Sequence, residues 1–251
     1  MTGWVVIAGL GPGSDTLVTP EVTAALADAT DVVGYIPYVR RVPKRQGLMR
    51  HETDNREELD RARHALEMAL EGRRVVVVSS GDPGVFAMAA AVYEAVEAGP
   101  AAWRSVDIRV LPGITAMLAA AARAGAPLGH DFCAINLSNN LKPWSLIEKR
   151  LRLAVEADFA IALYNPRSKA RPKSMSEALK LLREICEPSR VLIFARAVAT
   201  LEEKLSVVRL EDTSPNQADM RTVVLIGSSA TRIIERVDAA PIVYTPRAVP
   251  E

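Results

Sequence analysis

Short apolar runs alternate with amphipathic stretches along the first half of the chain. The predicted strands are 5–10, 31–34, 75–79 and 106–111, and the predicted helices are 21–29, 54–71, 85–97 and a helix that follows Pro112–Gly113 and ends at Ala124. Apolar runs this short, rich in valine and isoleucine, are typical of strands buried on both faces of a sheet. The alternation predicts a mostly parallel sheet with helices on both faces.

Polar residues mark the ends of two of these helices. Thr19 stands at an N-cap position, followed by Pro20 at the first helical position. Asp54 is a second candidate N-cap, with Glu57 placed to complete a capping box and Gly72 placed to end the helix.

The pattern changes near Gly125–Ala126–Pro127. Predicted strands follow at 132–137, 159–164, 191–195, 205–210, 222–227 and 242–244, with helices at about 143–157 and 174–186. Little helix separates the last three strands, so hairpin-like pairing and a mixed sheet are expected. We therefore predict two α/β domains, 1–125 and 126–251, with the active site in the cleft between them.

Composition excludes several classes of protein. The chain has 251 residues, is 49% hydrophobic and carries a net charge of +1, so no global field attracts nucleic acid or a membrane. The amino terminus lacks signal-peptide features, and no apolar run reaches transmembrane length. The two cysteines are expected to be buried thiols, and the three histidines, far apart in sequence, indicate no metal centre. A soluble, cytoplasmic protein is expected.

The most informative feature is the turn Ser79–Phe86, which directly follows a predicted strand. In open α/β sheets, ligands bind at the carboxyl ends of the strands. Gly81 and Gly84 let the backbone approach a ligand closely, and the Asp82 carboxylate can accept hydrogen bonds. The turn is therefore predicted to be a binding site.

A second glycine-rich turn, Gly9–Gly13, invites a dinucleotide-binding interpretation that the details oppose. Ser14 stands where the third glycine of the fingerprint belongs, the helix begins only near Pro20, and the second strand ends in Gly34–Tyr35 without an acidic residue. We expect this turn to line a ligand cleft and to present Asp15 to it. A tight turn without a ligand is the alternative.

Four motifs in a fixed order resemble the tetrapyrrole (class III) S-adenosylmethionine-dependent methyltransferases and cover nearly the whole chain. They are Gly9–Gly13, Ser80–Pro83, Pro112–Ala116, and Leu137–Asn139 after Gly129–Phe132. Three further segments, Val33–Tyr38, Asn139–Trp144 and Leu163–Pro172, resemble the precorrin-3B C17-methyltransferases of cobalamin biosynthesis. The resemblance implies the tetrapyrrole methylase fold, a homodimer, S-adenosylmethionine as cofactor, and methylation at C17 with ring contraction to precorrin-4.

The resemblance also implies a set of residues that bind the cofactor. They are Gly81, Asp82, Phe86, Thr115, Ala116, Tyr164, Asn165, Val198, Ile226 and Gly227. Asp82 would accept hydrogen bonds from the ribose hydroxyls or the amino group; an Asx turn is its alternative role. Core packing is the alternative for Phe86 and Val198.

A second set is predicted to bind the acidic macrocycle. It comprises Gly11, Pro12, Gly13, Tyr38, Ser138, Asn139, Asn140, Arg167, Lys169 and Arg171. Arginine binds carboxylates through two hydrogen bonds, although basic loops are often only solvated surface. Ring contraction needs a general acid–base group, and the candidates are His130, Asp15 and Tyr35. A histidine has the intrinsic pKa that suits this role best. The alternative for His130 is that it only caps a turn before the strand.

Other functions stay open at this point. A related enzyme that acts on a cobalt-loaded precorrin or at another ring carbon fits the same motifs. A non-catalytic tetrapyrrole-binding protein would bind pigment without a saturable cofactor site. A dinucleotide oxidoreductase is disfavoured by Ser14.

Overall fold

The computed structural model describes residues 3–54 and 57–248 of the chain. They form two compact units, divided between Thr115 and Ala116. The boundary expected at Gly125 lies at the other end of the helix α5 (Ala116–Ala124), which belongs to the second unit. Each unit is an α/β structure built around a five-stranded sheet.

The first unit contains a parallel sheet in the order β3-β2-β4-β1-β5. Its strands are β1 (Trp4–Gly9), β2 (Asp31–Tyr35), β3 (Met49–Thr53), β4 (Arg74–Ser79) and β5 (Asp107–Leu111). Its helices are α1 (Pro20–Asp28), α2 (Ile36–Val39), α3 (Glu58–Leu70) and α4 (Met88–Ala98), with 3-10 turns η1 (Asp15–Leu17) and η2 (Ala101–Ser105).

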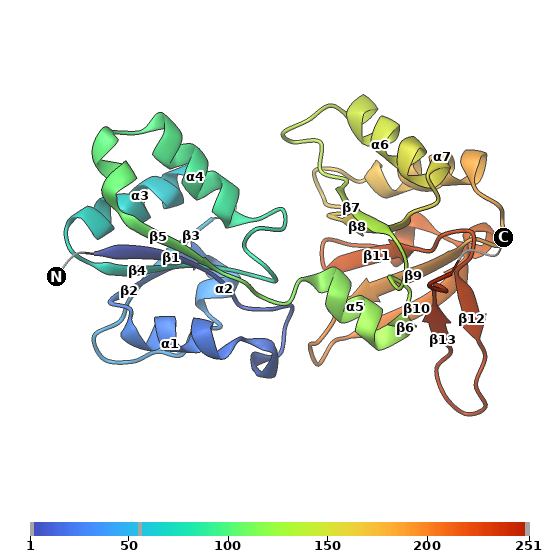
Figure 1. Ribbon diagram of the computed structural model, residues 1–251, viewed down its shortest axis with the longest axis horizontal. Coiled ribbons are helices and arrows are strands. Elements are labelled where there is room, and N and C mark those ends of the chain that lie inside the picture. Colours follow the sequence, from blue (N-terminus) through green and yellow to red (C-terminus); the bar gives the residue numbers. More distant parts are fainter. Residues whose placement is uncertain (1–2, 55–56, 249–251) are drawn as a thin grey trace. The chain divides into compact units, whose positions relative to one another are not determined.

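Helices cover both faces of this sheet, as predicted (Figure 1). Alternate side chains of each central strand point to opposite faces, so Val75 and Val77 pack with α3 and α4, while Val76 and Val78 pack with α1 and α2. All four valines are fully buried.

Local capping decides where the helices begin. The N–H of Val22 donates to the Thr19 hydroxyl at 3.3 Å, which confirms the predicted N-cap of α1. The helix α3 begins at Glu58, later than the predicted start at Asp54; Glu57 occupies its N-cap position without a side-chain capping hydrogen bond. Residues 55 and 56 of that prediction lie outside the described part of the chain.

The second unit contains a mixed sheet in the order β10-β9-β11-β8-β7, as predicted. The expected hairpin pairing among the last three predicted strands is wrong, because β10 and β11 both pair with β9 and the strand at 242–244 belongs to a separate small sheet. Its strands are β7 (Phe132–Asn136), β8 (Ala160–Tyr164), β9 (Val191–Arg196), β10 (Lys204–Arg209) and β11 (Thr222–Ile226). A small sheet joins β6 (Gly125–Ala126), β12 (Arg232–Ile234) and β13 (Ile242–Tyr244).

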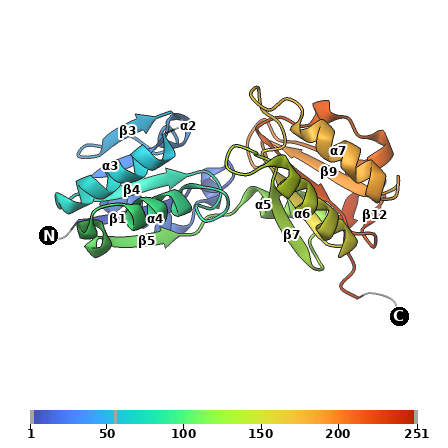
Figure 2. The same ribbon diagram turned by 90° about the horizontal axis from the view of Figure 1, so that it is seen from above.

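Helices also cover both faces of the mixed sheet, and Figure 2 looks onto the face that carries two of them. The helices α6 (Trp144–Glu156) and α7 (Ser174–Ile185) pack on one face, and α5 packs on the other together with β13. Two 3-10 turns, η3 (Leu210–Asp212) and η4 (Pro215–Gln217), lead into β11. No helix within residues 3–54 and 57–248 is long and apolar enough to cross a membrane.

Candidate functional site

Three glycine turns meet at the carboxyl edge of the first sheet. The strands β4, β1 and β5 are neighbours, so the turns that follow them are neighbours too. A Cβ atom on Gly113 would lie 2.2 Å from the carbonyl oxygen of Gly81, and one on Gly9 would lie 2.6 Å from the same oxygen. Only glycine allows this backbone-to-backbone packing. We call Gly9, Gly81 and Gly113 the glycine junction.

The first glycine turn is bound directly to the second. Gly81 N–H donates to Gly11 O at 2.9 Å, and Gly11 N–H donates to Gly81 O at 3.1 Å. Both residues have positive φ, +67° at Gly11 and +65° at Gly81. The turn containing Gly11, Pro12 and Gly13 is therefore a fixed part of this edge.

Asp82 uses both carboxylate oxygens within the protein. One accepts from Gly84 N–H at 2.8 Å and forms an Asx turn; the other accepts from Gly113 N–H at 3.0 Å. The Asx turn, which was the alternative role considered for Asp82, is thus present in the structure. A carboxylate oxygen has further lone pairs, so these contacts leave Asp82 able to accept from a ligand.

Arg41 is a residue of this edge that the predicted site does not include. Its guanidinium donates to the carbonyl oxygens of Leu10 and Gly11, the latter at 3.0 Å. Burial lowers its pKa, and the charge of Asp15 acts in the opposite direction. Arg41 stands in a run of basic residues in the sequence, and only the tertiary structure distinguishes it from its solvated neighbours.

Two tyrosines lie at the end of β2 on the same edge. The rings of Tyr35 and Tyr38 are 5.3 Å apart between centroids and nearly perpendicular. Burial and the neighbouring Tyr35 raise the pKa of Tyr38, against the opposing charges of Arg41 and Arg61. Tyr38 therefore stays protonated at neutral pH and can donate a hydrogen bond.

Phe86 has an unusual backbone. Its φ is +55°, although it is not a glycine, and its side chain is 47% exposed. A large residue keeps this conformation only where its surroundings enforce it, and such residues cluster at ligand sites. The exposure argues against core packing, the alternative role of Phe86.

Thr115, another residue of the predicted cofactor set, is buried at the end of the first unit.

The second unit has its own group of polar residues at the carboxyl ends of β7 and β8. The side-chain oxygen of Asn136 accepts from Ser138 N–H at 2.8 Å and from the side-chain amide of Asn165 at 3.1 Å. Asn165 has a φ of +52°, a conformation that asparagine tolerates better than most residues. Asn136 is absent from the predicted site because it reads as an ordinary strand residue.

The amino end of α5 belongs to this group. Met117 N–H donates to the Tyr164 hydroxyl at 3.0 Å, and Ala116 packs in the same apolar cluster. The predicted residues Ala116 and Tyr164 are therefore neighbours.

Val198 follows β9 at this edge, between two strained alanines. Ala197 and Ala199 have φ values of +49° and +62°, and Val198 itself is buried. The N–H of Ala199 donates to the carboxylate of Glu203, which also pairs with Arg123 of α5. Val198 packs in the apolar core, which was its alternative role, while the αL alanines on either side of it point to a backbone shape under functional constraint.

The basic loop after β8 is partly engaged with its own chain. Arg167 donates to the Asn216 side chain at 2.8 Å, and Arg171 donates to Asn165 O at 3.2 Å, while Lys169 is exposed. Asn139 and Asn140 are also exposed.

Three predicted residues lie at the opposite edge of the second sheet. β11 runs antiparallel to β8 and β9, so Ile226 pairs with Ile161 and Leu192, and Gly227 N–H donates to Val191 O. His130 precedes β7, whose other end carries Asn136. The structure thus does not bring Ile226, Gly227 or His130 to Tyr164, Asn165 and Val198, because β11 runs antiparallel to β8 and β9 and His130 precedes β7.

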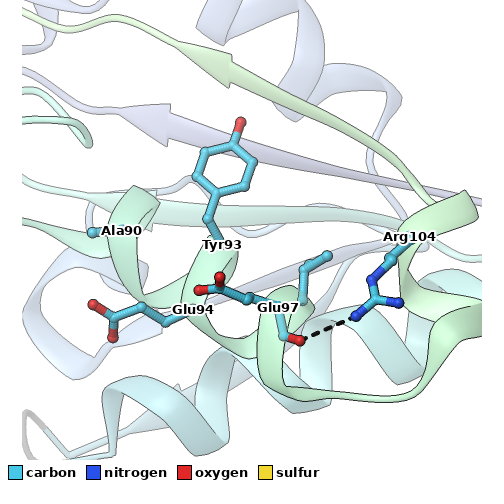
Figure 3. Close-up of a pocket in the computed structure, with 6 residues that line it drawn as sticks. Ala90, Tyr93, Glu94, Glu97 and Arg104 are labelled. Carbon is cyan, nitrogen blue, oxygen red and sulfur yellow. Dashed lines mark hydrogen bonds between the residues drawn. The ribbon is translucent and has the colours of Figure 1, made fainter.

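A surface depression on α4 contains none of the predicted residues (Figure 3). It is lined by Ala90, Tyr93, Glu94, Val96, Glu97 and Arg104, and Arg104 donates to Glu97 O at 3.2 Å. Its lining offers no group arrangement that points to a reaction.

Comparisons with known proteins agree on one family. The model of the tetrapyrrole (corrin/porphyrin) methylases matches residues 5–213. A precorrin-3B C(17)-methyltransferase from Sinorhizobium sp. is 56% identical over 247 residues, which cover 98% of this chain and 97% of that protein. A probable cobalt-factor III C(17)-methyltransferase from Salmonella typhimurium is 37% identical, with coverage of 95% and 98%.

Solved structures show the same fold. The crystal structure of the methyltransferase CobJ superposes with a TM-score of 0.93 at 68% identity, covering 97% of this chain and 100% of that chain. A uroporphyrin-III C-methyl transferase from Thermus thermophilus, complexed with S-adenyl homocysteine, gives 0.67 at 22% identity, with coverage of 90% and 97%. The second likeness concerns the fold alone.

Proposed function

The chain belongs to the tetrapyrrole (corrin/porphyrin) methylases, and from this premise we propose that it is a precorrin-3B C17-methyltransferase. It transfers a methyl group from S-adenosylmethionine to C17 of precorrin-3B, with ring contraction to precorrin-4, in cobalamin biosynthesis. The observation that carries the proposal is the 56% identity to a protein of that name along nearly the full length of both chains.

The residues of the first unit fit S-adenosylmethionine. The ligand carries hydroxyl and amino groups, and the close backbone packing of the glycine junction fixes the turn that carries Asp82 and Phe86. Asp82, fixed by Gly84 and Gly113, has lone pairs left to accept from a hydroxyl. Phe86 offers an exposed ring on a strained backbone. Thr115 and Ala116 are assigned to the same ligand.

In the second unit, we assign Tyr164, Asn165 and Val198 to the cofactor. Their backbone groups follow parallel strands at one edge, and Asn165 and the flanks of Val198 have positive φ. Ile226 and Gly227 were assigned with them on resemblance, and their position at the other edge of the sheet gives this assignment no geometric support.

When bound, the cofactor supplies an electrophilic methyl group on its sulfonium. The chain's contribution to that step is positioning, since a well-oriented reaction gains about 7–11 kcal/mol from effective molarity. Asp82, the glycine junction and Arg41 hold the first edge in one shape, so its binding groups need no rearrangement.

We assign a set of basic and polar residues to the carboxylate-rich macrocycle. Tyr38 can donate a hydroxyl hydrogen bond, and Lys169 is exposed with its ammonium available. Arg167 and Arg171 are oriented by Asn216 and Asn165, which leaves further N–H groups on each guanidinium. The remaining assigned residues are Gly11, Pro12, Gly13, Ser138, Asn139 and Asn140.

For the proton transfer in ring contraction, we favour Tyr35 or Asp15 over His130. Tyr35 ends β2 and Asp15 begins η1, both at the carboxyl edge of the first sheet, whereas His130 lies at the amino end of β7 with its Nδ1 3.7 Å from the Asp131 carboxylate. The proton would pass from the ring hydroxyl of the substrate to the Asp15 carboxylate, or to the Tyr35 oxygen while the Tyr35 hydroxyl releases its own proton to water.

We also propose a cytoplasmic homodimer. Both cysteines, Cys133 and Cys186, are free, and burial raises the pKa of each thiol, as suits a protein of a reducing compartment. Large apolar side chains are exposed on the second unit, among them Leu141, Leu201 and Val237, which a second copy would cover. Light scattering on the purified protein tests the dimer.

A second candidate function rests on the 37% identical relative, a probable cobalt-factor III C(17)-methyltransferase. The experiment that separates the two is incubation with labelled S-adenosylmethionine and either metal-free precorrin-3B or its cobalt form. Mass and carbon-NMR analysis should show label at C17 of the metal-free product. Labelled methyl found only in the product of the cobalt form would favour the second candidate. A separate calorimetric titration with S-adenosylmethionine that shows no saturable binding would indicate a non-catalytic pigment carrier.

A charge-reversal variant tests the substrate assignment. Lys169→Glu should raise the apparent KM for the macrocycle and leave the Kd of the cofactor unchanged, because the side chain is exposed and its charge is assigned to the substrate carboxylates alone. Equal effects on both constants would contradict the assignment.

A further inference from the structure

Two histidines meet in the first unit, away from the residues assigned to methyl transfer. His51 lies in the middle of the edge strand β3, opposite Val33 of β2, and His64 lies on α3. His51 Nδ1 and His64 Nε2 are 3.4 Å apart, and the rings are 5.1 Å apart between centroids. Nothing in the hydrophobic pattern pairs these two histidines, because the polar strand β3 is not recognisable in it.

The separation of the two nitrogens matches one coordination geometry. Two imidazole nitrogens bound to one Zn²⁺ at about 2.0–2.1 Å lie about 3.3–3.4 Å apart when the angle at the metal is tetrahedral. At a right angle, as in square-planar or octahedral sites, they would lie only about 2.9 Å apart. The observed 3.4 Å therefore equals the nitrogen separation of a tetrahedral site, and the two rings need only turn so that both lone pairs point at the shared ion.

A buried carboxylate fixes the orientation of His51. His51 Nε2 is 2.8 Å from Asp31, whose side chain is fully buried. Asp31 is itself held by the guanidinium of Arg73 and by the Thr30 hydroxyl at 2.7 Å. With Nε2–H donated to Asp31, Nδ1 carries its lone pair toward His64. A metal-binding histidine nearly always donates its other N–H in this way.

Both rings are reachable from solvent. The His51 side chain is 21% exposed, and His64 is exposed on the surface of α3. Across residues 3–54 and 57–248, no group of three or more His, Cys, Asp or Glu side chains is placed to share an ion. The site therefore offers two protein ligands, and water or small anions would complete the coordination.

We propose that His51 Nδ1 and His64 Nε2 bind one tetrahedral late transition-metal ion, with Zn²⁺ as the best fit. On binding, the proton that His64 Nε2 donates to His51 moves to His64 Nδ1, so both rings stay neutral and no proton is lost. The ion joins the edge strand β3 to α3 and stabilises the first unit, since any ligand of the native state does so. The proposal is independent of the methyltransferase assignment.

Zinc titration in competition with a chromophoric chelator, on the full chain, tests the proposal. One equivalent of Zn²⁺ should bind, shift the imidazole NMR signals of His51 and His64 but not those of His130, and raise Tm. His64→Ala should weaken the binding by at least about tenfold and abolish the Tm shift. His64 is exposed, so this variant should fold, which far-UV circular dichroism checks.

Two further variants sharpen the test. Asp31→Asn should weaken zinc binding by about 10–100-fold while both ligands remain, as for other carboxylates behind metal-bound histidines. Arg63→Ala, an exposed neighbour of His64 on α3, is the matched control and should bind zinc like the parent. Unchanged affinity in His64→Ala, or a shift of His130 alone, would overturn the proposal.

Discussion

The carboxylate of Asp82 accepts a hydrogen bond from the backbone N–H of Gly113 at 3.0 Å. This contact joins the turn after β4 to the turn after β5, across the turn after β1 that lies between them in the sheet. The other oxygen of the same carboxylate closes the Asx turn to Gly84. Asp82 therefore sets the shape of the glycine junction in addition to its proposed contact with the cofactor.

Asp82→Asn tests this double role. The amide keeps one acceptor and turns a donor toward a backbone N–H, so one partly buried N–H loses its partner at a cost of about 1–3 kcal/mol. We expect a lower Tm and a weaker Kd for S-adenosylmethionine, measured by calorimetry, with an unchanged far-UV spectrum. Weaker binding at an unchanged Tm would mean that the carboxylate serves the ligand alone.

Gly113→Ala should be far more harmful than its size suggests. The added Cβ would lie 2.2 Å from Gly81 O and 2.8 Å from Gly9 O, so two backbones would have to move. We expect a loss of at least about 2–3 kcal/mol in the free energy of unfolding. The control is Gly84→Ala, where the nearest atom is a side-chain oxygen at 3.2 Å. Equal stability of the two variants in urea would contradict the packing.

Two variants at Asn165 distinguish a role of its backbone conformation in cofactor binding from a role of its side chain. Alanine at a φ of +52° costs about 1–2 kcal/mol, and glycine does not. If the backbone shape is what the cofactor needs, Asn165→Gly should retain more cofactor affinity than Asn165→Ala. If the hydrogen bond to Asn136 is what matters, both variants should lose affinity equally, and Asn136→Ala should lose it as well.

The ion pair of Glu187 and Arg190 predicts an acid-sensitive stability. Burial by itself raises the pKa of Glu187, but two hydrogen bonds with Arg190, at 2.7 and 2.9 Å, outweigh it, so the net pKa is lowered. A lowered carboxyl pKa contributes stability above the unfolded-state value of about 4.3 that is lost as pH falls through the folded value.

Glu187→Gln should therefore lower Tm at pH 7 and flatten the decline of Tm below about pH 4.3. Arg190 is only 5% exposed and would keep Asp158 and Gly227 O as partners. Glu184→Gln, which alters an exposed pair with Arg152, is the control and should follow the parent curve. Parallel curves for Glu187→Gln and the parent would refute the linkage.

Helices and strands could be predicted from the sequence where the burial of one or both faces requires apolar residues at regular positions. Val75–Val78 reads as a buried strand and is one, and Thr19 caps α1. Prediction failed for β3, because the edge strand Met49–Thr53 is polar and half-solvated and has no apolar alternation. Without β3, neither the position of His51 nor its contact with His64 was predictable.

The same limit applied to the site. The motifs located the glycine turns, but the Asp82–Gly113 contact joins residues far apart in the chain, and no local pattern encodes it. The roles of Arg41 and Asn136 depend on tertiary hydrogen bonds for the same reason. Strand direction is also invisible locally, so the pattern does not reveal that Ile226 and Gly227, which the resemblance groups with Tyr164 and Asn165, lie at the opposite edge.

The position of His130 leads to a final prediction about proton transfer. It precedes β7, and a strand of this length carries the chain roughly 3.3 Å per residue toward Asn136 at the other edge. A general acid–base group contributes about 10²–10⁴-fold. Among the candidates, Tyr35→Phe or Asp15→Asn should therefore lower kcat for ring contraction by about 100-fold or more. His130→Ala should lower it by less than about tenfold.

The measurement is single-turnover formation of precorrin-4, with methyl transfer and contraction followed separately by mass and carbon NMR. A proton-transfer variant should still transfer labelled methyl, because attack on the sulfonium needs positioning rather than a base, and should accumulate an uncontracted product. A variant that loses both steps together has lost binding or folding. If His130→Ala alone blocks contraction while methylation continues, the proton acceptor lies at the amino end of β7, and the assignment to the carboxyl edge of the first sheet is wrong.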